Sequence, residues 1–205
     1  MGTNMGRRKR RRWAGLGAGF VLGAVAVAAI PSAQGTARAA HTASQSRMAP
    51  AAGQPGGDIP DSAVYLRYVG RGFSIEYVEG WLQTAAARGV TFNDKDSLVA
   101  VELRPRVAGA LAAYVQQVDL PRLARTAGFA RGALTRDFVG GHAAMRLSFR
   151  DRSAADAVTG KTVALQSDRY YVQGSRALAV ITLSTPLGVD NVDGFRRIAH
   201  SFRFR

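Results

Sequence analysis

The chain has 205 residues, a formal net charge of +14 and no cysteine. Without cysteine, a disulfide framework and the cysteine-linked lipoprotein form are both excluded. The charge suggests nucleic acid, but six basic residues form one run at 7–12, and from Asp61 onward 20 Lys+Arg accompany 13 Asp+Glu without a dense cluster. We interpret this as a solvated arginine-rich surface and expect no nucleic-acid partner; an anionic surface or polymer stays open as an alternative.

The N-terminal sequence predicts that the protein is exported or anchored at a membrane. A basic leader, residues 1–12, precedes the uncharged apolar segment 13–30, which as a helix of 1.5 Å rise reaches about 27 Å, close to the hydrocarbon thickness of a bilayer. Basic residues stay on the cytoplasmic side, so the rest of the chain is expected across the membrane. The segment is either a permanent anchor or a signal peptide cleaved near Ala39, where Ala37-Arg38-Ala39 has the small-x-small pattern. Both alternatives predict an extracytoplasmic protein, and adjacent arginines before Trp13 allow twin-arginine export.

A linker is predicted at residues 31–62. This stretch has no aromatic residue and is rich in Ala, Gly and Pro, so it offers too little apolar surface to offset the entropy of ordering. The remaining residues, 63–205, suit one globular domain with an adequate core.

Alternating apolar and polar residues predict strands along this domain. Around residues 73–77, 99–104 and 142–150 the two faces differ in polarity, which is typical of half-buried strands in a single sheet with one solvated side. The segment Ala177 to Leu183 is apolar on both faces and is expected to be a central strand. Its partner is predicted at Val163 to Gln173, joined through a turn at Gly174-Ser175.

Two helical regions are predicted among the strands. Apolar residues recur at helical spacing from Val107 to Val118, after which Asp119 is expected to cap a short helix with Pro121 near its first position. The last helix is expected to start at a capping box formed by Asp190 and Asp193. Its apolar stripe comprises Val192, Phe195, Ala199 and Phe202. This order predicts an α+β fold, a central antiparallel sheet with packed helices, preceded by the N-terminal apolar helix.

Several motifs carry a resemblance to a known fold group. They are the segments Gly72 to Tyr77 with Gly80-Trp81, Tyr170 to Val172, Ala179 to Pro186 and Phe195 to Phe202. Over residues 64–205 the chain resembles the PsbP-like group, which includes photosystem extrinsic PsbP proteins, Mog-type transport factors and exported LpqN-type lipoproteins. It departs from the group's pattern in having Val78-Glu79 where a proline usually precedes Gly-Trp, and in lacking the lipoprotein cysteine.

The resemblance implies a non-catalytic accessory or binding domain with a central antiparallel sheet between helices. Together with the N-terminal segment, it leads us to expect an accessory or interaction module at the outer face of the cytoplasmic membrane, with a protein partner in a membrane complex. It supplies no catalytic residues and no cofactor. Two other functions stay open: a secreted carrier of a small or lipidic ligand, which predicts a sizeable apolar cavity, and a hydrolase, which predicts a Ser or Asp beside His142 or His200 in a cleft.

Catalytic and metal sites find little support in the sequence. His142 and Ser148 lie on one strand about 20 Å apart at about 3.3 Å per residue, and no Gly-x-Ser-x-Gly elbow is present. The three histidines are far apart in sequence, and Asn93-Asp94-Lys95-Asp96 lacks most ligands of a calcium loop, so it is predicted to be a turn.

Aromatic and basic residues give the predicted binding site. We expect a groove where sheet and helix diverge to present four aromatic side chains, with two arginines on the same hairpin, for contact with a partner protein or an anionic ligand. These residues are Tyr65, Trp81, Arg169, Tyr170, Tyr171 and Arg176.

Overall fold

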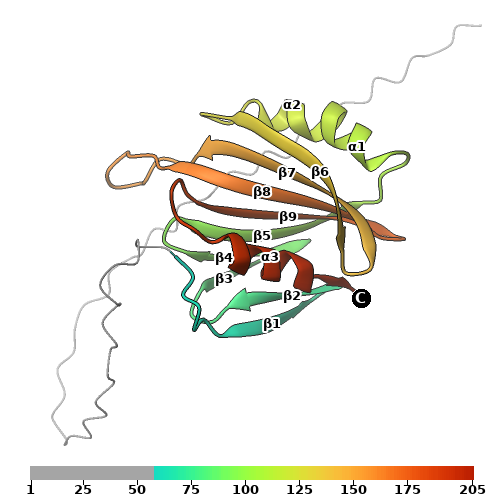
Figure 1. Ribbon diagram of the computed structural model, residues 1–205, viewed down its shortest axis with the longest axis horizontal. Coiled ribbons are helices and arrows are strands. Elements are labelled where there is room, and N and C mark those ends of the chain that lie inside the picture. The colour runs from blue at the N-terminus through green and yellow to red at the C-terminus, as the bar shows by residue number, and fades with distance from the viewer. Residues whose placement is uncertain (1–57) are drawn as a thin grey trace, which may run out of the picture. The chain divides into compact units, whose positions relative to one another are not determined.

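The computed structural model describes residues 58–205 (Figure 1). The predicted leader, the apolar helix at 13–30 and most of the linker at 31–62 lie outside the described residues. Within residues 58–205 no helix is long and apolar enough to cross a bilayer.

The larger of two sheets has seven antiparallel strands in the order β3, β4, β5, β9, β8, β7, β6 (Figure 1). The strands are β3 (Leu82–Ala86), β4 (Gly89–Asp94), β5 (Ser97–Pro105), β6 (Ala130–Val139), β7 (His142–Arg152), β8 (Ala164–Gln173) and β9 (Ala177–Pro186). Strand β9 lies in the middle, and β8 precedes it in a hairpin, which confirms the predicted central strand and its partner. Most of β9 is buried because side chains on both of its faces pack into a core.

A second, three-stranded sheet makes the expectation of a single sheet wrong. It contains β1 (Tyr65–Gly70), β2 (Phe73–Val78) and the short C-terminal β10 (Arg203–Phe204), in the order β1, β2, β10. Strand β2 is buried on both faces, with Ile75 0% and Ser74 5% exposed, because one face packs on the large sheet and the other lies under the last helix. Its alternating sequence therefore did not reveal a strand covered on both sides.

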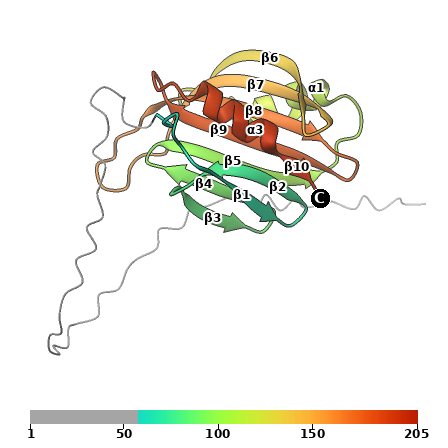
Figure 2. The same cartoon turned by 60° about the horizontal axis from the view of Figure 1, so that its bottom comes forward.

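Helix α3 (Val192–Ser201) covers one face of the large sheet together with the small sheet (Figures 1 and 2). Phe195, Ala199 and Phe202 of the predicted stripe are buried, whereas Val192 is 56% exposed. The predicted capping box is wrong. Asn191 occupies the N-cap position, and the exposed Asp193 pairs with Arg196 one turn along the helix.

The opposite face of the large sheet is covered by a continuous helical segment of three parts: α1 (Leu111–Tyr114), the π-helical η1 (Val115–Asp119) and α2 (Leu120–Leu123). Val107 precedes this segment rather than belonging to it. A wide π turn directly before Pro121 has a physical reason, because proline lacks an N–H and its ring clashes with the carbonyl four residues earlier in an α-helix. Asp119 makes no capping hydrogen bond, so its predicted role is wrong.

The Asp119 carboxylate instead joins this helical segment to the sheet. Its side chain is 2% exposed. One oxygen accepts from Arg104 at 2.8 Å, and the other accepts from Arg169 at 3.0 Å and from the Tyr171 hydroxyl at 2.6 Å. Burial alone would raise the pKa of Asp119, but these hydrogen bonds and positive charges hold it below its ordinary value. The carboxylate therefore stays ionised inside the fold.

We expect Asp119→Asn to lower the free energy of unfolding by about 3 kcal/mol, because the partly buried Arg169 loses its carboxylate partner and Arg104 keeps only Glu102 as a carboxylate partner. Urea denaturation at neutral pH measures this change. Asp193→Asn, on an exposed side chain, is the control and is expected to leave stability unchanged. Equal stability of both variants would contradict a structural role for the cluster.

Lowering the pH should remove the stabilisation that the ionised Asp119 carboxylate provides. Because the folded pKa of Asp119 is depressed, its stabilisation is present above the unfolded value of about 3.9 and is lost as pH falls through the folded pKa. Denaturation curves between about pH 5 and 2 should show a steeper loss for the wild-type chain than for Asp119→Asn. Parallel curves would mean that the carboxylate titrates normally.

The turn between β6 and β7 lies against the residue that precedes the C-terminal strand. Gly140 has φ +60°, and a Cβ there would lie against the carbonyl oxygen of Phe202, whereas Gly141, at φ +85°, has open space around it. We expect Gly140→Ala to cost about 3 kcal/mol of stability and Gly141→Ala about 1 kcal/mol, the backbone strain alone. Thermal unfolding of the two variants checks this, and equal losses would exclude the close approach.

Candidate functional site

The structure does not gather the six predicted binding residues into one groove. Tyr170 and Tyr171 are 2% and 0% exposed and point to opposite faces of β8, into two separate core clusters. Arg169 is held by Asp119. The exposed Arg176 lies in the turn between β8 and β9. A common binding role for this set stays a prediction that its geometry does not favour.

The other two predicted residues are partly buried at the edge of the core. Trp81 directly precedes β3 and packs against the core cluster that contains Ile75 and Phe92. Tyr65 lies under α3, where the guanidinium carbon of Arg197 is 3.9 Å from its ring centroid. This distance is typical of a cation–π contact, so Tyr65 helps to fix α3 on the small sheet.

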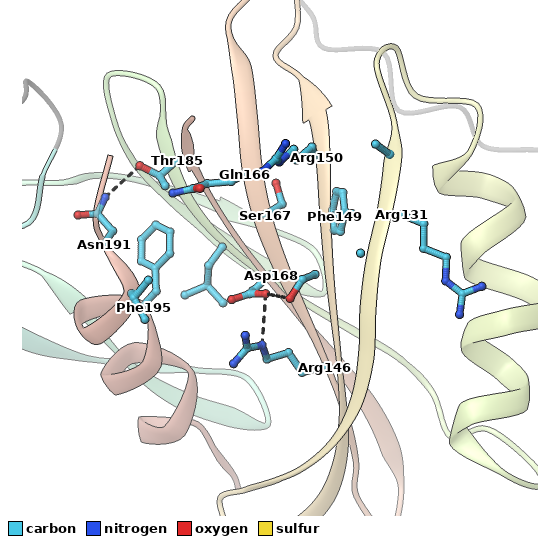
Figure 3. Close-up of a pocket in the computed structure, with 15 residues that line it drawn as sticks. Arg131, Arg146, Phe149, Arg150, Gln166, Ser167, Asp168, Thr185, Asn191 and Phe195 are labelled. Carbon is cyan, nitrogen blue, oxygen red and sulfur yellow. Dashed lines mark hydrogen bonds and ion pairs between the residues drawn. The ribbon is translucent and has the colours of Figure 1, made fainter. Parts of the chain in front are cut away.

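A groove beside α3 is the best-formed candidate site (Figure 3). It has a volume of about 460 Å³ and lies between the N-terminal half of α3 and strands β6 to β9. Its apolar lining includes the buried Leu183 and Phe195, and the exposed Val192 stands at its rim. Strand β6 bends over the groove where its pairing with β7 shifts register between Arg131 and Leu134.

Gly132 makes this bend possible. A Cβ at Gly132 would come within 2.7 Å of the Ser148 carbonyl oxygen, so only glycine lets the two backbones approach so closely. Without this close approach, β6 would stand farther from β7 and the groove would lose one wall.

An ion pair crosses the floor of the groove. Arg146 Nε lies 3.3 Å from Asp168 Oδ1, and the Ser148 hydroxyl donates to the same carboxylate oxygen at 2.5 Å (Figure 3). Arg146 is therefore largely neutralised by Asp168. Arg150, on the same face of β7, is exposed and forms no ion pair with a carboxylate within residues 58–205. The side chain of Arg131 turns away from the groove in Figure 3. The groove thus offers one available positive charge beside apolar walls.

Hydrogen bonds fix the end of the groove next to α3. The Asn191 amide donates to the Thr185 hydroxyl at 3.0 Å, and its carbonyl oxygen accepts from the backbone N–H of Ile59 at 2.6 Å. The Gln166 amide donates to the carbonyl of Val189 at 2.7 Å. The loop that leads into α3 is therefore held against β8 and β9, so this wall is formed in advance of binding.

In residues 58–205 the histidines near the groove do not form a catalytic pair with a serine hydroxyl. His200 Nε2 lies 3.6 Å from Asp137 Oδ2, which supplies a carboxylate beside one histidine, and the His142 ring packs edge-on against Phe204. In the described part of the chain no serine hydroxyl is hydrogen-bonded to either histidine. Burial raises the pKa of the neighbouring Tyr170 hydroxyl, which the charge of Arg146 only partly opposes, so this hydroxyl is protonated at neutral pH.

No cluster of three or more His, Asp or Glu side chains that could hold a metal occurs in residues 58–205. The segment Asn93 to Asp96 connects β4 and β5 as a turn, with Lys95 at φ +51°, as the sequence predicted. The surface grooves of residues 58–205 are lined by charged as well as apolar residues. They give no support to a secreted carrier of a lipidic ligand, which predicts a sizeable apolar cavity.

Sequence reasoning recognised one face of β7 but missed the site to which it belongs. The alternation around residues 142–150 predicted two faces of different polarity, and the structure confirms this, with Arg146, Ser148 and Arg150 on one face of β7. Asp168 and Phe195 could not be assigned to the same groove, because β8 and α3 approach β7 only in the folded chain. Val192 was predicted to belong to the apolar stripe of the last helix, so its exposure at the rim of the groove had no signal in the sequence.

Comparison with known proteins addresses the fold. No protein-family model matches the chain, and no curated protein matches it. The solution structure of cyanobacterial PsbP (CyanoP) from Synechocystis sp. PCC 6803 is 17% identical and covers 74% of this chain and 99% of its own length, with a TM-score of 0.51.

Two crystal structures align less closely. LpqN of Mycobacterium tuberculosis, described as involved in cell envelope biogenesis, is 14% identical over 69% of this chain and 90% of its own, with a TM-score of 0.43. A protein of Bacteroides thetaiotaomicron is 10% identical over 68% of this chain and 48% of its own, with a TM-score of 0.47. The similarity to CyanoP carries the conclusion that this chain has a PsbP-like α+β fold, as its strand motifs predicted.

Proposed function

We propose that residues 58–205 form a non-catalytic interaction domain that works at the outer face of the cytoplasmic membrane, where residues 13–30 anchor it or direct its export. The proposal is that the domain binds a partner protein in a membrane complex through the groove beside α3. The PsbP-like fold supports the general class, since folds of this kind host accessory proteins as well as other functions.

The observation that carries the proposal is the combination of apolar walls and one available cation in a preformed groove. Val192, 56% exposed, offers apolar surface to a partner in front of the buried Phe195, and Arg150, which pairs with no carboxylate of residues 58–205, also lines the groove. This arrangement suits a partner segment in which an acidic side chain follows or precedes an apolar one. The neutralised Arg146 favours no second charge, so the groove selects for a single carboxylate.

A photo-crosslinking amino acid at Val192 tests the proposal in cells that produce the full chain. We expect one discrete protein adduct, and Arg150→Glu in the same chain should reduce its yield about tenfold, since charge reversal at a contact costs about 1.4 kcal/mol or more. The control position is Val158, which is 92% exposed and lies in the loop between β7 and β8. A missing adduct at Val192, or the same adduct from Val158, would contradict the assignment of the groove.

The same preparation distinguishes the alternative of a secreted carrier. A soluble chain that begins near Ala40 and holds a small molecule in place of a protein partner would favour that alternative. Retention of the intact leader together with the crosslinked partner would favour a tethered accessory protein.

A further inference from the structure

Six arginines that are scattered through the sequence meet at one end of the domain. We call this surface the arginine end, and it consists of Arg71, Arg88, Arg106, Arg176, Arg203 and Arg205. The strand register places them together. The turn between β3 and β4 lies at this end with the end of β5, because Gly89 pairs with Glu102, three residues before Pro105. The turn between β1 and β2 lies nearby, since Arg71 lines the same cleft as Arg88 and Pro105. Pro105 in turn pairs with Ala177, the residue after Arg176.

The C-terminal strand brings the last two arginines to the same place. The backbone N–H of Arg205 donates to the carbonyl of Gly72 in the turn β1–β2, and Arg203 lies beside Gly140 in the turn β6–β7. These turns all lie at the right-hand end of the domain in Figure 1, next to the C-terminus.

The arginine end has little negative charge of its own. All six arginines are exposed, and none forms an ion pair with a carboxylate of the described residues. The nearest acidic side chains are engaged, Glu102 with Arg104 and Asp137 with His200. The turns at the opposite end of the strands carry acidic residues, among them Asp94, Asp96 and Asp156, together with the basic residues Lys95, Arg152 and Lys161. That end therefore has mixed charge, whereas the arginine end is positive.

A cleft between two of the turns offers a place for an anionic group. It has a volume of about 570 Å³ and is lined by Arg71 and Arg88, with Tyr68 and Leu103 among its apolar neighbours. Neither guanidinium group pairs with a side chain of residues 58–205, and both can bind phosphate oxygens in the bidentate manner that arginine favours.

Two exposed apolar side chains accompany the arginines. Val69, 56% exposed, directly precedes the turn β1–β2, and Phe138, 63% exposed, lies two residues before Gly140. Apolar side chains among basic residues are typical of surfaces that rest on a bilayer, where the cations contact headgroups and the apolar groups enter the interface.

We propose that the arginine end docks on an anionic phospholipid surface, with a lipid phosphate bound between Arg71 and Arg88. A bilayer fits better than a single small anion, because the six arginines come from turns of both sheets and spread over a whole end of the domain. The inference is independent of the groove beside α3. It rests on the proposed extracytoplasmic location only for the identity of the membrane.

The absence of cysteine makes a direct test possible, since one introduced cysteine carries a spin label at a chosen place. The full chain is labelled at Ala87→Cys, in the turn β3–β4, or at Val158→Cys, near the opposite end, and is mixed with vesicles. Depth-dependent relaxation of the label is measured in neutral phosphatidylcholine vesicles and in vesicles with phosphatidylglycerol. The apolar segment and the basic leader are present in every sample, so differences between the two label positions report the orientation of the domain.

We expect the Ala87→Cys label to contact lipid only in the anionic vesicles and the Val158→Cys label to stay in water in both. Arg71→Ala with Arg88→Ala should lower the ratio of docked to undocked domain about 30-fold, since each basic residue near an anionic surface contributes about a fivefold factor. Arg125→Ala with Lys161→Ala removes the same charge from exposed positions near the opposite end and should leave docking unchanged.

Three results would overturn the proposal. They are equal lipid contact by both labels, contact that does not depend on lipid charge, and equal effects of the two double variants. A further sample has neutral vesicles and soluble polyphosphate. If polyphosphate immobilises the Ala87→Cys label as strongly as anionic vesicles do, the arginine end is a site for phosphate polymers and the assignment to a lipid surface is wrong.

Discussion

The burial of β9 on both faces is the constraint on which the rest of the structure depends. Its side chains alternate between two cores: Ile181 and Leu183 pack below α3 and the small sheet, while Leu178 and Val180 pack below the helical segment at 111–123. A seven-stranded sheet with such a centre is unstable unless both faces are covered, because exposed apolar surface is costly in water. The layers of the domain follow from this requirement.

The layers that cover the two faces of the large sheet are attached in different ways, and the groove lies beside the layer that contains α3. On one face the Asp119 carboxylate binds two guanidinium groups and a tyrosine hydroxyl, so the helical segment is fixed by a buried ionic cluster. On the other face α3 is held mainly by apolar packing and by contacts at its edges, such as Arg197 with Glu76 and Tyr65. The sheet beside α3 stays open, and the groove occupies this open part.

Two of the arginines that the sequence offered for binding therefore have different roles. Arg169 is used within the fold, because it neutralises a buried carboxylate, while Arg176 remains in solvent at the arginine end. The hairpin between β8 and β9 thus carries a structural cation on its strand and an available one in its turn. A charge on a strand face meets whatever layer covers that face, whereas a charge in a turn meets only solvent or a partner.

The sequence by itself determined the local structure: the alternation in β5 and β7, the two-sided apolar run of β9 with its hairpin to β8, and the PsbP-like motifs. It did so because strand periodicity and turn chemistry act between near neighbours. Only the tertiary structure decided that β2 belongs to a second sheet, that Asp119 is a buried counter-ion rather than a helix cap, and that six separate arginines meet at one end. Those outcomes depend on which strands pair across long stretches of chain, and no pattern within a single element encodes that pairing.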